Sequence, residues 1–67
     1  MAKINKRILL QRAESEFLRG EYASALRNYS LILKDYPMLD EAKVGAYLSD
    51  LGIEREEEAQ ALFDYYQ

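Results

Sequence analysis

The chain has 67 residues, a formal net charge of −3 and neither cysteine nor histidine. A chain of this length forms one domain, residues 1–67, and buries only about 60% of its unfolded surface, so its core is marginal. The missing residue types exclude disulfides, thiolate metal sites and the commonest general base. No apolar run approaches the roughly 20 residues that cross a bilayer, so we expect a cytoplasmic protein without membrane contact.

The charge is divided unevenly along the chain. Residues 1–34 hold seven basic and three acidic side chains, net +4, whereas residues 35–67 hold two basic and nine acidic ones, net −7. This division favours contact between the two halves, within one molecule or between two. The alternative is that both sets are solvated faces, because exposed ion pairs contribute only roughly 0–1 kcal/mol each.

Apolar residues recur at helical spacing from residue 3 to residue 19 and predict a first helix there. One side of it carries Leu9, Leu10, Ala13 and Phe17, and another carries Ile4, Ile8 and Leu18. A helix with two apolar sides needs more than one neighbour. Gly20 provides the left-handed residue that ends this helix.

A second helix is predicted over residues 22–36. Its apolar stripe has the i, i+3, i+4, i+7 spacing and consists of Tyr22, Ala25, Tyr29, Ile32, Leu33 and Tyr36. Ala25 is small at the point where a neighbouring helix comes close. Pro37 disfavours helical geometry at Tyr36 and ends the element.

Two further helices are predicted, over residues 39–51 and 54–66. Asp40 is expected to cap the first, Gly45 to mark a close approach inside it, and Gly52 to end it. The second begins with a run of glutamates, which suit a helix N-terminus, although the run is alternatively a docking site for a basic partner. Its apolar stripe is Ala59, Leu62, Phe63 and Tyr66.

The predicted connections are short, so consecutive helices are expected to pack antiparallel. The sequence therefore predicts an all-α fold of about four helices. Residues 1–37 form a first hairpin and residues 38–67 a second, arranged as a right-handed stack or a small bundle.

The first hairpin resembles a tetratricopeptide repeat. The resemblance rests on Ala13 in the first helix, on Gly20 and Tyr22 at the turn, and on three later residues, Ala25, Tyr29 and Pro37. A shift of 34 residues, the period of that family, carries Ala25 to Ala59 and Tyr29 to Phe63. The resemblance covers nearly the whole chain and is strong over residues 13–37.

The sequence departs from the family pattern at three positions. The family has a large apolar residue where Arg12 stands, an aromatic one where Glu16 stands and a small one where Tyr47 stands. The second hairpin is therefore expected to be degenerate or to serve as a cap.

Resemblance to this family implies a module that binds a protein or peptide in a groove lined by the first helix of each hairpin. Carried onto this chain, the groove residues are Arg7, Leu10, Glu14, Phe17, Leu18, Val44, Leu48 and Leu51. Independently of the family, Leu10 and Phe17 lie seven residues apart on one stripe, where a partner segment can cover them. The alternative is that both residues pack as core.

Self-association, in a homodimer or a scaffold, is the second functional hypothesis. Repeat folds need about three units or capping surfaces, and this chain has fewer than two full units. Apolar residues of the end helices therefore lack a predicted neighbour: Ile4, Ile8, Phe63, Tyr65 and Tyr66. The chain is alternatively a piece of a longer repeat array.

The sequence argues against two other classes of function. Nucleic-acid binding is disfavoured by the net charge of −3 and by the acidic second half. An enzyme is not expected, because the sequence has neither a nucleophile–base pair nor a glycine-rich phosphate loop. We expect no catalytic residue, no cofactor and no metal site.

Overall fold

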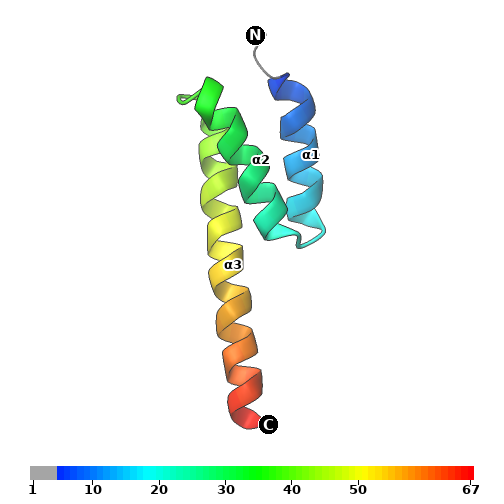
Figure 1. Cartoon of the computed structure of the whole chain (residues 1–67), viewed down its shortest axis with the longest axis vertical. Helices are drawn as coiled ribbons and strands as arrows, with labels where there is room; N and C mark the ends of the chain where they lie inside the picture. The colour runs from blue at the N-terminus through cyan, green and yellow to red at the C-terminus, as the bar shows by residue number, and fades with distance from the viewer. Residues whose placement is uncertain (1–4) are drawn as a thin grey trace.

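A computed structural model describes residues 5–67, and within that range the chain is all-helical with three helices (Figure 1). Helix α1 spans Lys6–Leu18, α2 spans Tyr22–Asp35 and α3 spans Asp40–Tyr66. The prediction of an all-α fold is confirmed. The prediction of four helices is wrong, because the two C-terminal helices are one continuous helix of 27 residues.

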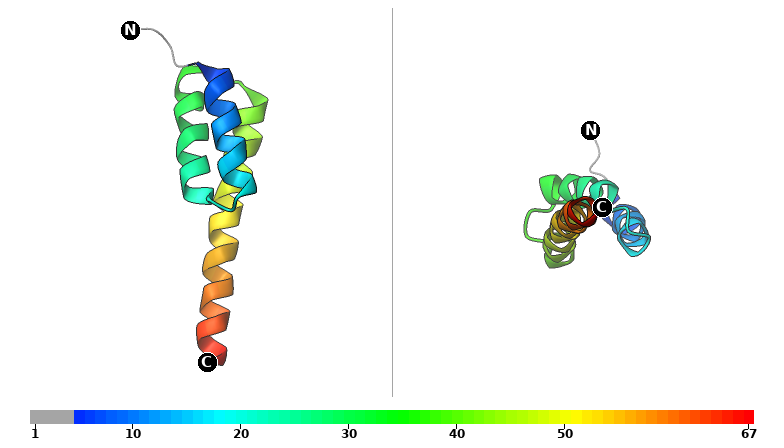
Figure 2. Two further views of the ribbon diagram at one scale, coloured as in Figure 1. Left: turned by 90° about the vertical axis from the view of Figure 1, so that its right-hand side faces the viewer. Right: turned by 90° about the horizontal axis from the view of Figure 1, so that it is seen from below.

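The three helices lie side by side in an antiparallel order over one half of the molecule, which we call the body. Helix α2 lies between α1 and α3, so that α1 and α3 diverge from it like two arms when the molecule is seen along its length (Figure 2). The second part of α3 leaves the body and extends alone (Figure 1). The molecule is therefore elongated, with extents of 51 × 19 × 18 Å.

The ends of α1 follow local rules that the sequence shows only in part. The side chain of Asn5 accepts a hydrogen bond of 3.2 Å from the backbone N–H of Ile8 and caps the helix, which begins at Lys6. The start predicted at residue 3 lies outside the described residues. Gly20 has a φ of +81°, the left-handed conformation predicted for the turn. Helix α2 begins at Tyr22, as predicted, and Tyr36 caps its C-terminus before Pro37.

Glycines of α3 receive the tyrosine rings of α2. A Cβ atom on Gly45 would overlap the ring of Tyr29, and one on Gly52 would lie 2.7 Å from Cγ of Tyr22. The two tyrosines are seven residues apart, and so are the two glycines. The later tyrosine meets the earlier glycine, which is the register of an antiparallel helix pair. The close approach predicted at Gly45 is thus confirmed, and Gly52 makes a second one.

Gly52 does not end a helix, contrary to the prediction. Glycine costs about 1 kcal/mol inside a helix relative to alanine, which is why the sequence suggested a break there. The contact with Tyr22 supplies the missing reason for a glycine at this position. The helix continues through it to Tyr66.

The second hairpin, predicted over residues 38–67, is therefore absent from the described residues. The 34-residue period equated Ala59 and Phe63 with Ala25 and Tyr29. Both are exposed, and they belong to the same helix as Gly45 and not to a separate second helix. Asp40 is the first residue of α3, whose N-cap is Leu39 without a side-chain capping bond. The predicted cap at Asp40 is wrong, although its charge still suits the first turn.

The core lies where α2 meets its two neighbours. Its buried apolar members are Ala13, Ala25, Tyr29, Ile32 and Ala42, and half-buried leucines and aromatic residues pack around them. The buried side of α3 also holds Ser49, whose hydroxyl has no hydrogen-bond partner among the described residues. Every residue from 54 to 67 is exposed, so the core ends where α3 leaves the body.

Candidate functional site: the groove between α1 and α3

Two adjoining hollows follow the line between α1 and α3. The first has a volume of about 430 Å³ and is lined by Lys6, Arg7, Leu10, Gln11, Glu14, Leu39 and Glu41. The second, of about 410 Å³, is lined by Glu14, Tyr29, Asp40, Glu41, Val44, Gly45 and Leu48. Because Glu14 and Glu41 line both, we treat them as one site and call it the groove.

The structure brings together most of the residues that the sequence assigned to a groove. Five of the eight line it: Arg7, Leu10, Glu14, Val44 and Leu48. The other three do not. Phe17 packs edge-on against Tyr22 with the ring centroids 5.4 Å apart, and Leu18 is exposed at the end of α1. Leu51, the third residue assigned from α3, is half-buried and lines neither hollow.

Sequence reasoning missed the contribution of α2 to this site. Tyr29 lines the groove beside Gly45, so the residue that contacts the glycine also forms part of the groove wall. The position of Tyr29 in the apolar stripe of α2 indicated a core residue. Nothing in the sequence pattern indicated that it also lines a groove. Burial raises the pKa of the Tyr29 hydroxyl, and the nearby charge of Glu14 raises it further.

The groove combines an apolar wall with a charged border. Val44 and Leu48 remain 56% and 39% exposed and lie one helical turn apart, so they form a small contiguous apolar patch. Arg7 lies at one end, while carboxylates of Glu14 and Glu41 border both hollows. Such a surface suits a segment with an apolar side and polar edges.

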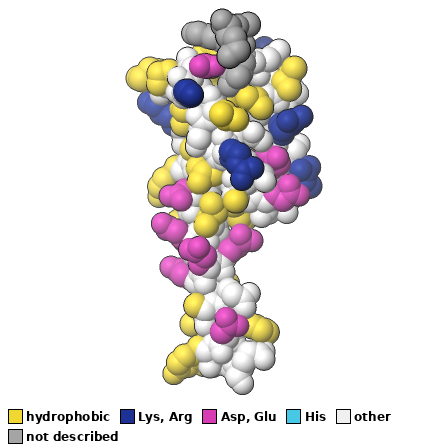
Figure 3. Space-filling view, viewed as in Figure 1, with side chains coloured by type: hydrophobic (Ala, Val, Ile, Leu, Met, Phe, Trp, Pro, Cys, Tyr) yellow, Lys and Arg dark blue, Asp and Glu magenta, His cyan; other side chains and the backbone are white. Residues whose placement is uncertain are grey.

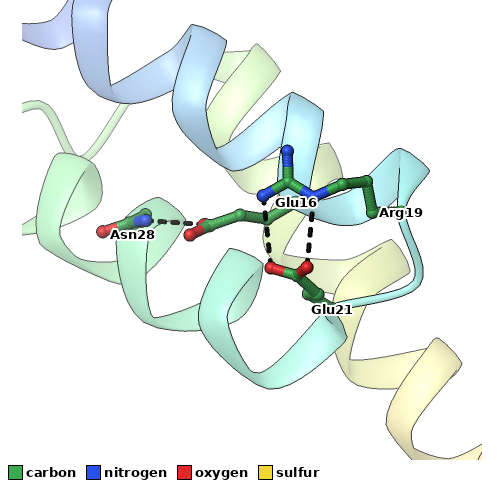
Figure 4. A network of polar contacts seen from close by, with 4 residues as sticks. All are labelled: Glu16, Arg19, Glu21 and Asn28. Atoms are coloured by element: carbon green, nitrogen blue, oxygen red, sulfur yellow. Dashed lines mark hydrogen bonds and ion pairs between the residues drawn. The ribbon is translucent and has the colours of Figure 1, made fainter.

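Polar contacts tie α1 to α2 elsewhere in the body (Figure 4). The Asn28 amide donates a hydrogen bond of 2.7 Å to the carboxylate of Glu16. Across the turn, Arg19 donates two hydrogen bonds to Glu21, of 3.1 and 3.2 Å. This contact lowers the pKa of the Glu21 carboxyl and raises that of the Arg19 guanidinium.

The residues predicted to support self-association do not form one surface. Ile8 is exposed on α1, whereas Phe63, Tyr65 and Tyr66 are exposed at the far end of α3. The rings of Tyr65 and Tyr66 contact each other edge-on at 5.1 Å. Ile4 lies outside the described residues.

The glutamate run is not at a helix start. The four residues Glu54, Glu56, Glu57 and Glu58 lie in the middle of α3, where the favourable effect of a helix N-terminus does not reach. Acidic side chains gather along this part of α3, with hydrophobic ones further towards its end (Figure 3). We call residues 54–66 the projecting half.

Other site types find no support in the described part of the chain. Residues 5–67 contain no group of three or more side chains that could hold a metal ion, and none of their helices is long and apolar enough to cross a membrane. Comparison with family models, curated proteins and solved structures finds no match for this chain. The groove is therefore interpreted from its own geometry.

Proposed function

We propose that the protein is a non-catalytic interaction module that binds an apolar helical or extended segment of a protein chain in the groove. The observation that carries this proposal is the exposure of Val44 and Leu48 beside the hollow above Tyr29. A bound segment would cover these side chains and thereby remove apolar surface from water, which is the main source of affinity in such sites.

We also propose that the body follows the plan of a tetratricopeptide repeat and the first helix of the next one. In support, Ala13 and Ala25 are fully buried, and Gly20 turns the chain between α1 and α2. The groove then corresponds to the concave side of such a stack, where first helices lie side by side.

The binding proposal is tested with peptides selected from a display library on the full chain. Binding is then compared between Leu48→Glu and Tyr47→Glu. Both variants place a new carboxylate at neighbouring positions of α3, but Tyr47 is exposed and does not line the groove. We expect Leu48→Glu to weaken binding at least tenfold and Tyr47→Glu to leave it nearly unchanged. Equal effects of the two variants, or no selected peptide, would refute the proposal.

A further inference from the structure

The projecting half of α3 is an unpartnered amphipathic helix attached to a body that has a groove. We propose that the occupant of the groove is the projecting half of a second copy of this chain, and that the two α3 helices pair antiparallel about a two-fold axis at Arg55. This inference rests on the proposed function of the groove, because it names the segment that the groove binds.

The first argument is a continuous stripe along α3. Seven residues fall within an arc of roughly 80° on a helix that turns 100° per residue. They begin at the groove and end at the tip of the projecting half: Val44, Leu48, Leu51, Arg55, Ala59, Leu62 and Tyr66. The groove wall thus continues as the apolar side of the projecting half.

The second argument is the symmetry of this stripe. Successive stripe residues are 4, 3, 4, 4, 3 and 4 positions apart. This series is the same in both directions from Arg55. An antiparallel pair centred there places Val44 against Tyr66 of the second copy. Leu48 then meets Leu62 of that copy, and Leu51 meets Ala59. Every apolar stripe position therefore has an apolar partner, which an isologous interface requires.

Phe63 supports the same arrangement. It lies beside the stripe, on the side of α3 that also carries Gly45 and Gly52. In the symmetric pair this side faces the body of the other copy. The ring of Phe63 is thus level with the second hollow of the groove and enters it near Tyr29 of the other copy.

The available area is sufficient for a specific dimer. Exposed fractions are 56% for Val44, 39% for Leu48, 58% for Leu62, 60% for Phe63 and 80% for Tyr66. Taking roughly 150–250 Å² for an aromatic side chain as an upper guide, these five present at most on the order of 600 Å² per copy. If all of it is covered, two copies bury on the order of 1,200 Å², the lower bound for specific interfaces, before any polar border is added.

Electrostatics provides a distinctive signature. The two-fold axis brings each Arg55 beside the glutamates of the second copy, but the eight carboxylates there outnumber the two guanidinium groups. The net effect is repulsion at the centre of the interface, between exposed groups that salt screens. The dimer is therefore held by apolar contacts and becomes tighter as salt is added.

The test is sedimentation equilibrium of the full chain from 5 µM to 1 mM, with a matched pair of variants. Ala59→Glu and Ala61→Glu make the same change on exposed alanines two residues apart, but Ala61 points roughly 120° away from the centre of the stripe. We expect a dimer for the natural sequence, at least tenfold weaker with Ala59→Glu and nearly unchanged with Ala61→Glu. We also expect it to be tighter in 0.5 M than in 0.05 M sodium chloride.

Disulfide trapping tests the register, since the chain has no cysteine of its own. A mixture of Leu48→Cys and Leu62→Cys chains is oxidised, and we expect the mixed disulfide to form in preference to either homodimer. A parallel pair would favour the two homodimers and would overturn the proposed arrangement.

The remaining outcomes separate this inference from the proposed function. A chain that stays monomeric at 1 mM, or a dimer that both glutamate variants weaken equally, overturns the second copy as occupant. So does a dimer that salt weakens. In each of these cases the proposed function still holds if selected peptides bind the groove and Leu48→Glu weakens their binding. The proposed function itself fails if no such peptide is found.

Discussion

The seating of Tyr29 on Gly45 allows a sharp test of how α2 and α3 pack. In the natural sequence, Gly45→Ala adds a Cβ atom that overlaps the Tyr29 ring, which is only 4% exposed and has little room to move. Overpacking of this kind costs about 1–3 kcal/mol, whereas alanine gains about 1 kcal/mol over glycine in a helix. We therefore expect a net loss of up to about 2 kcal/mol.

The effect of Gly45→Ala on the free energy of unfolding should change sign when the Tyr29 side chain is shortened. The overlap involves the far atoms of the ring, Cε1, Cε2 and Cζ, which Tyr29→Leu removes. In that background we expect Gly45→Ala to stabilise the fold by up to about 1 kcal/mol, through helix propensity alone. The double-mutant cycle then has a coupling free energy of roughly 1–3 kcal/mol, the cost of the overlap itself.

Thermal unfolding followed by circular dichroism measures all four chains of the cycle. For a domain of this size, a change of 1 kcal/mol shifts the midpoint by about 4–8 °C, so both signs are resolved. The reasoning fails if Gly45→Ala stabilises both backgrounds by the same amount, because the Tyr29 ring would then not lie over Gly45.

Three further predictions concern the body and the projecting half. Ser49→Ala should raise the free energy of unfolding by about 1 kcal/mol in urea titrations, because it removes a buried hydroxyl without a partner, and an unchanged or lower value would contradict this. The pKa of Tyr29 is raised in the folded state above its ordinary value of 10.0, so the stability that its neutral form contributes is complete below pH 10 and is lost as the pH rises through the folded pKa. Tyr29→Phe should therefore lose less stability between pH 9 and 11 than the natural sequence, and parallel curves would count against burial of this hydroxyl. Removing residues 54–67, all exposed, should change the free energy of unfolding by less than about 1 kcal/mol at low micromolar concentration, and a collapse of cooperative unfolding would show that the body needs this segment.

The first two helices were predictable because local signals and tertiary packing agree there. The stripe of α2, the left-handed turn at Gly20 and the stop before Pro37 all have local causes. The start of α1 was missed because the capping role of Asn5 went unrecognised, although asparagine is a preferred residue at that position.

The single helix of residues 40–66 was not predictable from local rules. Gly52 has the same local appearance whether it ends a helix or receives a ring, and only the partner Tyr22 distinguishes the two cases. The glutamates that follow then look like a helix start. A register check offered a signal, since Tyr22 and Tyr29 have the same spacing as Gly45 and Gly52.

The groove was predicted in part for a similar reason. Residues that line it from α1 and α3 follow from helical spacing, and five of the eight assigned residues lie along it. Phe17 does not, because it packs against Tyr22 of α2, and Leu18 does not, because it is exposed at the end of α1. The contribution of Tyr29 depends on the angle at which α1 and α3 diverge, which a sequence pattern does not determine.

The continuity of α3 through Gly52 is the central claim, and a distance between spin labels tests it most directly. Labels on Lys43→Cys and Tyr65→Cys are separated by 22 positions, or about 33 Å at 1.5 Å per residue in a single helix. The labelled chain is diluted with excess unlabelled protein, so that only distances within one copy are measured. We predict a single distribution centred near 33 Å, and a distance below about 15 Å would show that the chain folds back at Gly52 into a hairpin.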